Sequence, residues 1–295
     1  MRFKGAYTAL VTPFTSGGDL DVEAVKKILR QQIDGGIDGL VVAGTTGESP
    51  TLSEDEKRRY TELALEAARG KVPVIVGTGT NATRSTVLAT KAAKSWGADA
   101  ALVVCPYYNK PTQEGLFRHF QAVHQECGLP VVAYNVPGRT ASDLLPETIA
   151  RLVEIGAIAA VKDATANMQR AIETLAIVDR NKPFDLVSGD DFTILPFVAC
   201  GGTGVISVVS NLVPGDTARL VRETAAGNWS VARPLQTKLV DLSRALFSVS
   251  SPIPVKAGMS MLGLCTADLR LPLVAADEKT RASVKAAMER YGALL

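Results

Sequence analysis

Short apolar runs recur along the chain, and each is followed by a segment whose apolar residues have helical spacing. From the second run onward most begin 26 to 34 residues apart, about the length of one strand–helix–strand unit. Such runs are typical of strands buried on both faces of a parallel sheet. The eight runs cover residues 8–14, 39–44, 73–79, 101–108, 130–137, 158–164, 185–191 and 204–210.

The segments between the runs carry signals for helix starts. Ser53 and Glu56 form a capping-box pattern, Asn81 is placed to cap a helix reaching Trp96, and Thr112 a helix reaching residue 126. Alternation of strand and helix predicts a parallel sheet with helices outside. Eight repeats predict closure into a (β/α)8 TIM barrel.

The pattern changes after the eighth run. From about residue 214 onward only helical periodicity is found, interrupted by SSPIPVK and LRLPL, and no linker-like segment separates this part. We therefore expect a barrel over residues 1–225 and a helical extension over residues 226–295 that packs on the barrel.

Composition narrows the function. The 295 residues are 46% hydrophobic and 21% charged, which supports a large core, and the net charge is only +2. No basic run or basic-aromatic patch occurs, so a nucleic-acid partner is not expected. No apolar run approaches the length of a membrane span, and the first residues do not resemble a signal peptide. The expected location is the cytoplasm.

Cysteine and histidine offer little chemistry. The two histidines, His119 and His124, are five residues apart and so do not share a helix face for metal binding. The cysteines form no CxxC pair, so neither a zinc site nor a disulfide framework is predicted. We expect all four to be buried and reduced, although the sequence leaves the exposure of Cys105 open: Cys105, Cys127, Cys200 and Cys265.

Chemistry in such barrels lies at the carboxyl ends of the strands. In the sixth run, IAAVKDA, four apolar residues lead into Lys162, where burial would favour the free amine that attacks carbonyls and forms Schiff bases. Taken alone, a strand-end lysine that reaches solvent or pairs with Asp163 is the commoner case. Alternation along the strand turns Asp163 away from the barrel interior.

The other strand ends carry mainly hydroxyl groups. Thr45 and Thr46 stand in a glycine-flanked turn before a helix and can offer hydroxyl and N–H groups to a carboxylate, or serve only as turn residues. Tyr134, on the neighbouring strand, can carry protons for Lys162 or be a core tyrosine. Arg139 can bind a second carboxylate or form a surface ion pair.

The same strand ends argue against metals and phosphates. A metal site needs several convergent carboxylates or imidazoles, yet strands three to five end in glycine, threonine, tyrosine and asparagine. Strand seven ends in Asp190 and Asp191, which disfavours a phosphate there. A small keto acid fits the remaining groups best.

Eight motifs together resemble the dihydrodipicolinate synthase branch of the pyruvate-dependent aldolases, a family that includes N-acetylneuraminate lyase. The resemblance runs almost end to end, and YYNKP and YNVPGRT point to the synthase branch. The motifs are GTTGES at 44–49, GTGTNAT at 77–83, CPYYNKPTQEGL at 105–116, YNVPGRT at 134–140, VKDAT at 161–165, SGDD at 188–191, GVISV at 204–208 and PIPVK at 252–256.

This resemblance implies a lyase that needs no cofactor. Lys162 would form an imine with pyruvate, and the derived enamine would attack L-aspartate 4-semialdehyde, giving 4-hydroxy-tetrahydrodipicolinate for lysine biosynthesis through diaminopimelate. Two alternatives remain: a related aldolase acting on a sugar acid or 4-hydroxy-2-oxoglutarate, and a catalytically silent barrel that binds a keto acid.

The resemblance also implies roles for single residues. Thr45, Tyr134 and Tyr108 match a hydroxyl relay in which Tyr108 reaches across from a neighbouring subunit, so a homodimer is expected, and pairing of dimers into a tetramer is usual. Arg139 matches the receptor of the semialdehyde carboxylate, and Ile206 matches a backbone contact near the imine. Gly189 joins Thr46 among the expected substrate-binding residues.

Regulation is expected to differ from that of lysine-inhibited relatives. Their allosteric pocket contains a histidine and a glutamate where this chain has Lys57 and Ser85, while Asn81 and Tyr107 are retained. An added cation and a lost carboxylate both disfavour a bound lysine. We therefore predict weak or absent feedback inhibition.

Overall fold

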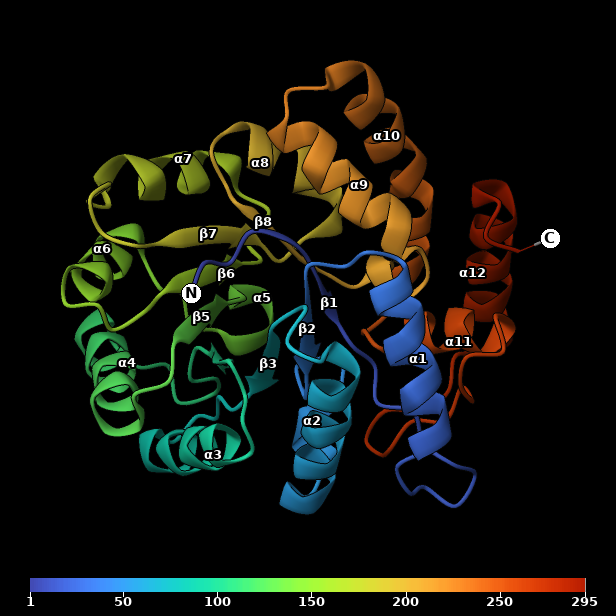
Figure 1. Ribbon diagram of the computed structural model, residues 1–295, viewed down its shortest axis with the longest axis horizontal. Helices are drawn as coiled ribbons and strands as arrows, with labels where there is room; N and C mark the ends of the chain where they lie inside the picture. Colours follow the sequence, from blue (N-terminus) through green and yellow to red (C-terminus); the bar gives the residue numbers. More distant parts are fainter. Residues whose placement is uncertain (295) are drawn as a thin grey trace.

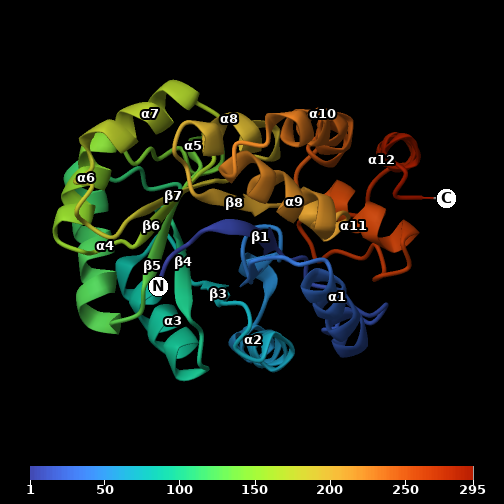
Figure 2. The same ribbon diagram turned by 45° about the horizontal axis from the view of Figure 1, so that its top comes forward.

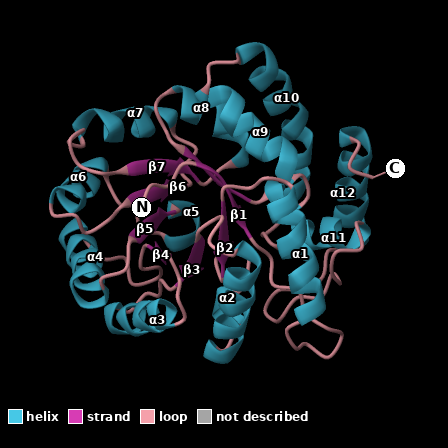
Figure 3. Ribbon diagram, in the orientation of Figure 1, coloured by secondary structure: helices cyan, strands magenta, loops and turns pink. Residues whose placement is uncertain are grey.

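Eight parallel strands close into a barrel in the computed structural model, which describes residues 1–294. Each strand pairs with its sequence neighbours, and β1 pairs with β8. Figure 3 shows the strands at the centre of a ring of helices, so the predicted TIM barrel is confirmed. The strands are β1 (Gly5–Ala9), β2 (Gly39–Val42), β3 (Val74–Gly77), β4 (Ala100–Val104), β5 (Val131–Asn135), β6 (Ala160–Asp163), β7 (Asp185–Ser188) and β8 (Gly204–Ser207).

Helices follow every strand, and most of them surround the barrel (Figure 1). They are α1 (Val22–Asp34), α2 (Glu54–Ala68), α3 (Thr83–Ser95), α4 (Gln113–Cys127), α5 (Pro137–Thr140), α6 (Pro146–Glu154), α7 (Met168–Ile177), α8 (Ile194–Ala199) and α9 (Pro214–Ala225). Three short 3₁₀ turns lie at strand ends: η1 (Ser49–Thr51), η2 (Asp191–Thr193) and η3 (Val209–Asn211).

The chain then continues into three more helices, α10 (Trp229–Leu246), α11 (Ile253–Met261) and α12 (Glu278–Tyr291). Helix α10 packs against α9 and α12, and α11 packs against α12. Figures 1 and 2 show these helices gathered on one side of the barrel, beside α1 and α9. The extension therefore lies close to the β1 and β8 side of the barrel.

Two local predictions were wrong. The first strand ends at Ala9, because the following apolar residues Leu10 and Val11 are buried in an irregular segment rather than in the sheet. Asn81 does not cap α3, whose N-cap is Ala82 without a side-chain hydrogen bond. The other two caps are confirmed: Ser53 and Glu56 form a capping box, and the Thr112 side chain accepts the Gly115 N–H.

The interior of the barrel is a packed core. Side chains that point inward from most of the strands form one cluster, while those that point outward pack against the helices. The inward cluster includes Tyr7, Val41, Ile75, Leu102, Val132, Tyr134, Val187 and Ile206. It closes the lower part of the barrel, so any cavity must lie above it at the strand ends.

The cysteines are not all buried. Cys105 and Cys127 are buried and Cys265 is half-buried, but Cys200 is exposed at the end of α8, so the prediction was wrong there. Burial raises the pKa of the Cys105 thiol to about 12, which leaves it unreactive at neutral pH. Within residues 1–294 no helix is long and apolar enough to span a membrane.

Candidate active site

Lys162 is the penultimate residue of β6, in the barrel wall. In the sheet it pairs with Tyr134 of β5 on one side and with Val187 of β7 on the other. Its side chain is 6% exposed, and Nζ lies 4.2 Å from the centre of the Tyr134 ring. Burial lowers the pKa of Lys162 to about 8, with Asp191 acting to raise it and Arg139 to lower it further. The amine is therefore partly unprotonated near neutral pH.

A small cavity of about 40 Å³ surrounds this amine at the carboxyl ends of the strands. Its lining includes six of the eight predicted site residues: Thr45, Thr46, Tyr134, Arg139, Lys162 and Gly189. Thr45, Tyr134 and Arg139 also line a wider chamber of about 340 Å³. The chamber is large enough for a second small substrate beside the lysine.

The turn from Gly44 to Glu48 lines the cavity with Gly44, Thr45 and Thr46 and carries unpaired backbone donors. The Gly44 carbonyl accepts the N–H groups of Gly47 and Ser49, and the Thr45 carbonyl accepts the N–H of Glu48. Within residues 1–294 the N–H groups of Thr45 and Thr46 donate no hydrogen bond. Two such donors on one turn suit a carboxylate. The sequence predicted that this turn leads directly into a helix. It leads instead into the 3₁₀ turn η1.

Tyr134 connects the turn to the lysine. Burial raises the pKa of its phenol, while Arg139 and the nearby Thr45 side chain act in the opposite direction. The phenol therefore stays protonated at neutral pH and can both give and accept a proton. Arg139 lies in α5, directly after β5, with its side chain on the exposed rim.

Gly189 is required for steric reasons. A Cβ at this position would lie 3.0 Å from Lys162 Cε and 2.7 Å from the Ala164 Cβ. The Gly189 N–H also donates to the Asp163 carbonyl at 2.6 Å. The glycine thus leaves the space that the lysine side chain occupies.

Two predicted site residues do not line the cavity. Tyr108 is 87% exposed on the β4–α4 loop, with φ +75°. Ile206 is buried in the inward cluster, and Val208 lines the cavity instead. The expected contact of Ile206 would therefore have to come through its backbone.

Three residues that line the cavity or lie near it were not identified from the sequence. Phe247 and Ser251 line the cavity from the connection between α10 and α11, and the buried Ser251 hydroxyl has no hydrogen-bond partner among residues 1–294. Asp191 is buried below the rim, where its Oδ2 accepts the N–H groups of Val208 and Val209. The PIPVK motif just after Ser251 was the available signal for the first two.

Asp163 faces away from the cavity, as predicted. Its Oδ2 accepts a hydrogen bond from Arg170 Nε at 3.1 Å, and its Oδ1 accepts from Thr165. Both charged side chains of this pair are almost fully buried. Asp163 is therefore engaged outside the barrel wall.

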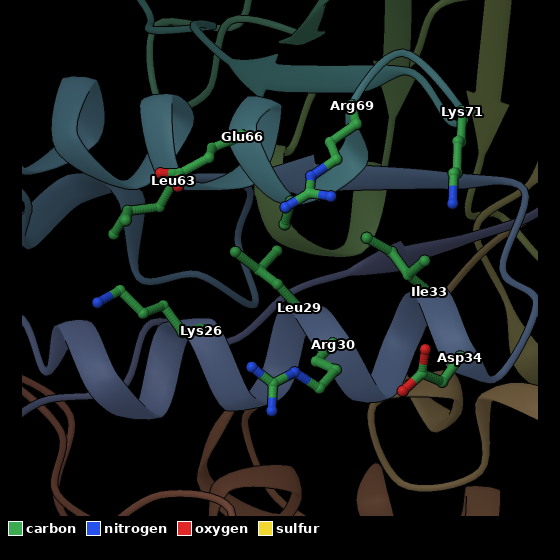
Figure 4. Close-up of a pocket in the computed structure, with 10 residues that line it drawn as sticks. Lys26, Leu29, Arg30, Ile33, Asp34, Leu63, Glu66, Arg69 and Lys71 are labelled. Carbon is green, nitrogen blue, oxygen red and sulfur yellow. The ribbon is translucent and has the colours of Figure 1, made fainter.

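Other features offer no comparable chemistry. No group of three or more histidine, cysteine or acidic side chains that could hold a metal occurs within residues 1–294. A groove of about 300 Å³ lies between α1 and α2, with a leucine and isoleucine floor and charged side chains on its rim (Figure 4). No strand-end residue lines it.

The chain is similar to known proteins over almost its whole length. The model of the dihydrodipicolinate synthetase family matches residues 2–291. The 4-hydroxy-tetrahydrodipicolinate synthase of Pelobacter propionicus is 46% identical over 290 residues, which cover 98% of this chain and 99% of that protein.

Solved structures agree equally well. Dihydrodipicolinate synthase of Thermotoga maritima is 42% identical, with a TM-score of 0.97 and full coverage of both chains. The chloride-inhibited Acinetobacter baumannii enzyme, in complex with pyruvate, is 38% identical, with a TM-score of 0.96 over 99% of each chain. The resemblance deduced from the eight motifs is thereby confirmed, and this chain belongs to the dihydrodipicolinate synthetase family.

Proposed function

We propose that this chain is a lyase that condenses pyruvate with L-aspartate 4-semialdehyde through a Schiff base on Lys162. The product is 4-hydroxy-tetrahydrodipicolinate, an intermediate of lysine and diaminopimelate biosynthesis. The observation that carries the proposal is a buried amine with a pKa of about 8, at the end of a barrel strand, beside a turn with two free N–H groups.

Imine formation uses the groups around this amine. The free amine of Lys162 attacks the keto carbon of pyruvate, and the resulting carbinolamine loses water to give the imine. Tyr134 carries the protons for this step, with Thr45 beside it in the cavity lining. The pyruvate carboxylate lies against the N–H groups of Thr45 and Thr46.

Carbon–carbon bond formation follows on the same lysine. Loss of a methyl proton converts the imine into an enamine, whose carbon attacks the aldehyde carbon of the second substrate. Arg139, on the rim of the wider chamber, holds the carboxylate of the semialdehyde. The amino group of that substrate then displaces Lys162 by transimination, which closes the ring and restores the free amine.

A second copy of the chain completes the relay in this proposal. Tyr108 is 87% exposed and does not line the cavity of its own chain. An aromatic side chain held this far out suits insertion into a neighbouring subunit. We therefore propose a homodimer that shares Tyr108, with two dimers pairing into a tetramer. The cytoplasmic location stays a prediction from the sequence.

Borohydride trapping tests the chemistry. Pyruvate and borohydride should leave a stable mass adduct on Lys162. In a separate assay without borohydride, the enzyme should consume aspartate semialdehyde in the presence of pyruvate. The matched control is Lys162→Arg, which keeps the charge and cannot form an imine. Absence of an adduct would refute the Schiff-base mechanism. An adduct without turnover of the semialdehyde would indicate a related aldolase.

A further inference from the structure

A buried ion pair joins the C-terminal extension to the turn that carries Thr45 and Thr46. Lys256 of α11 places its Nζ 2.7 Å from Oε1 of Glu48, and the two side chains are 0% and 1% exposed. The second carboxylate oxygen of Glu48 accepts the backbone N–H of Arg270 at 3.0 Å. Glu48 is thus held at both oxygens by residues more than 200 positions later in the chain.

The backbone of this turn is strained at both ends. Ala43 has φ +52° and Glu48 has φ +54°, so two residues with side chains adopt the left-handed conformation on either side of Gly44–Gly47. Such conformations persist where the surrounding structure holds them in place, and they concentrate at functional sites. At the Gly47 end, Thr12 Oγ1 donates to the Gly47 carbonyl at 2.6 Å, and the ion pair fixes Glu48.

A buried ion pair at this position is not explained by a contribution to stability alone. Desolvation of two buried charges largely offsets their attraction, and apolar residues of similar size often pack as well or better. What the pair supplies is direction, because a carboxylate that accepts from two fixed donors has one orientation. The residue so oriented lies two positions after Thr46.

We propose that the Glu48–Lys256 pair positions the Thr45–Thr46 turn so that its two free N–H groups converge on the pyruvate carboxylate. The inference rests on the proposed function. Glu48 and Lys256 are positioning residues, since neither lines the cavity. The C-terminal extension thereby contributes to pyruvate binding from behind the turn, in addition to the cavity wall formed by Phe247 and Ser251.

Paired substitutions separate positioning from stability. Glu48→Gln is nearly isosteric and should raise the KM for pyruvate by between about ten- and a hundred-fold, as expected for a misplaced binding group. The KM for aspartate semialdehyde should stay within a factor of about two, since Arg139 belongs to another segment, helix α5. A double variant, Glu48→Leu with Lys256→Met, removes both charges and should recover thermal stability relative to Lys256→Met alone. Its KM for pyruvate should nevertheless remain raised.

The control lies in the same extension. Arg244→Met removes an exposed ion pair with Asp241 and should change neither KM nor the melting temperature measurably. Folded variants of the buried pair with a wild-type KM for pyruvate would refute the positioning role, even if their melting temperatures fall. A wild-type protein that forms no pyruvate adduct would instead refute the proposed function, and this inference with it.

Discussion

The protonation of Lys162 sets how fast pyruvate can be captured. A lysine with its ordinary pKa of 10.5 is unprotonated in about one molecule in 3,000 at pH 7, whereas a pKa of about 8 leaves about one in ten unprotonated. Burial therefore increases the reactive form about 300-fold at neutral pH. The free amine is the nucleophile, so imine formation should become faster as pH rises and should level off above pH 8.

Trapping rates provide the assay. At low pyruvate concentration and with borohydride present, the rate of adduct formation should rise about tenfold from pH 7 to pH 9 and then change little. A lysine with an ordinary pKa would give about a hundred-fold rise over the same range without levelling. Burial raises the pKa of Tyr134, so its phenol should stay protonated in this window. A profile that keeps rising through pH 9 would refute the assigned pKa.

A substitution at Asp191 tests whether its carboxylate raises the pKa of Lys162. Its carboxylate favours the ammonium form of Lys162, and Asp191→Asn keeps an oxygen to accept the Val208 and Val209 N–H groups while removing the charge. The midpoint of the trapping profile should therefore move below pH 8. Asp190→Asn is the matched control and should leave the midpoint unchanged. A midpoint that rises in the Asp191 variant would contradict the electrostatic account.

Three further predictions concern neighbouring groups. Tyr134→Phe should still form the adduct but slow it by about 10²-fold, measured by borohydride trapping. Gly189→Ala should reduce the adduct strongly because its Cβ would lie 3.0 Å from Lys162 Cε, whereas Gly215→Ala, with its nearest contact at 3.7 Å, should not. Lysine at sub-millimolar concentration should leave the steady-state rate unchanged, since Lys57 adds a cation to the chamber wall; inhibition there would contradict this prediction.

The sequence predicted the barrel because each of its eight strands is a local apolar run followed by helical periodicity. The prediction of strand bounds failed where buried apolar residues do not belong to a strand. Leu10 and Val11 are as apolar as any strand residue, yet they are buried by α-helical packing beyond the end of β1. Hydrophobicity reports burial, and it cannot tell a strand from an irregular segment inside the core. The division of the chain at residue 225 stays a prediction.

The site was predicted to a similar extent and for a similar reason. Parallel strands bring their carboxyl ends to one edge, so Thr45, Tyr134 and Lys162 could be placed together from their positions in the runs. Ser251 and Glu48 could not, because their contacts depend on where the extension packs. No periodic signal encodes the 2.7 Å approach of Lys256 to Glu48 over 208 positions.

The surroundings of Lys162 favour its proposed role as the reactive group over that of a structural lysine. A structural lysine at a strand end should pair with a carboxylate, and Asp163 is the nearest one in sequence. Asp163 instead pairs with Arg170 on the far side of the barrel wall, and among residues 1–294 Lys162 forms no ion pair within 4.0 Å. A buried amine without such a partner is destabilising to the fold. A loss of stability of this kind is expected where the amine is the reactive group. The cavity beside the amine has room for a keto acid.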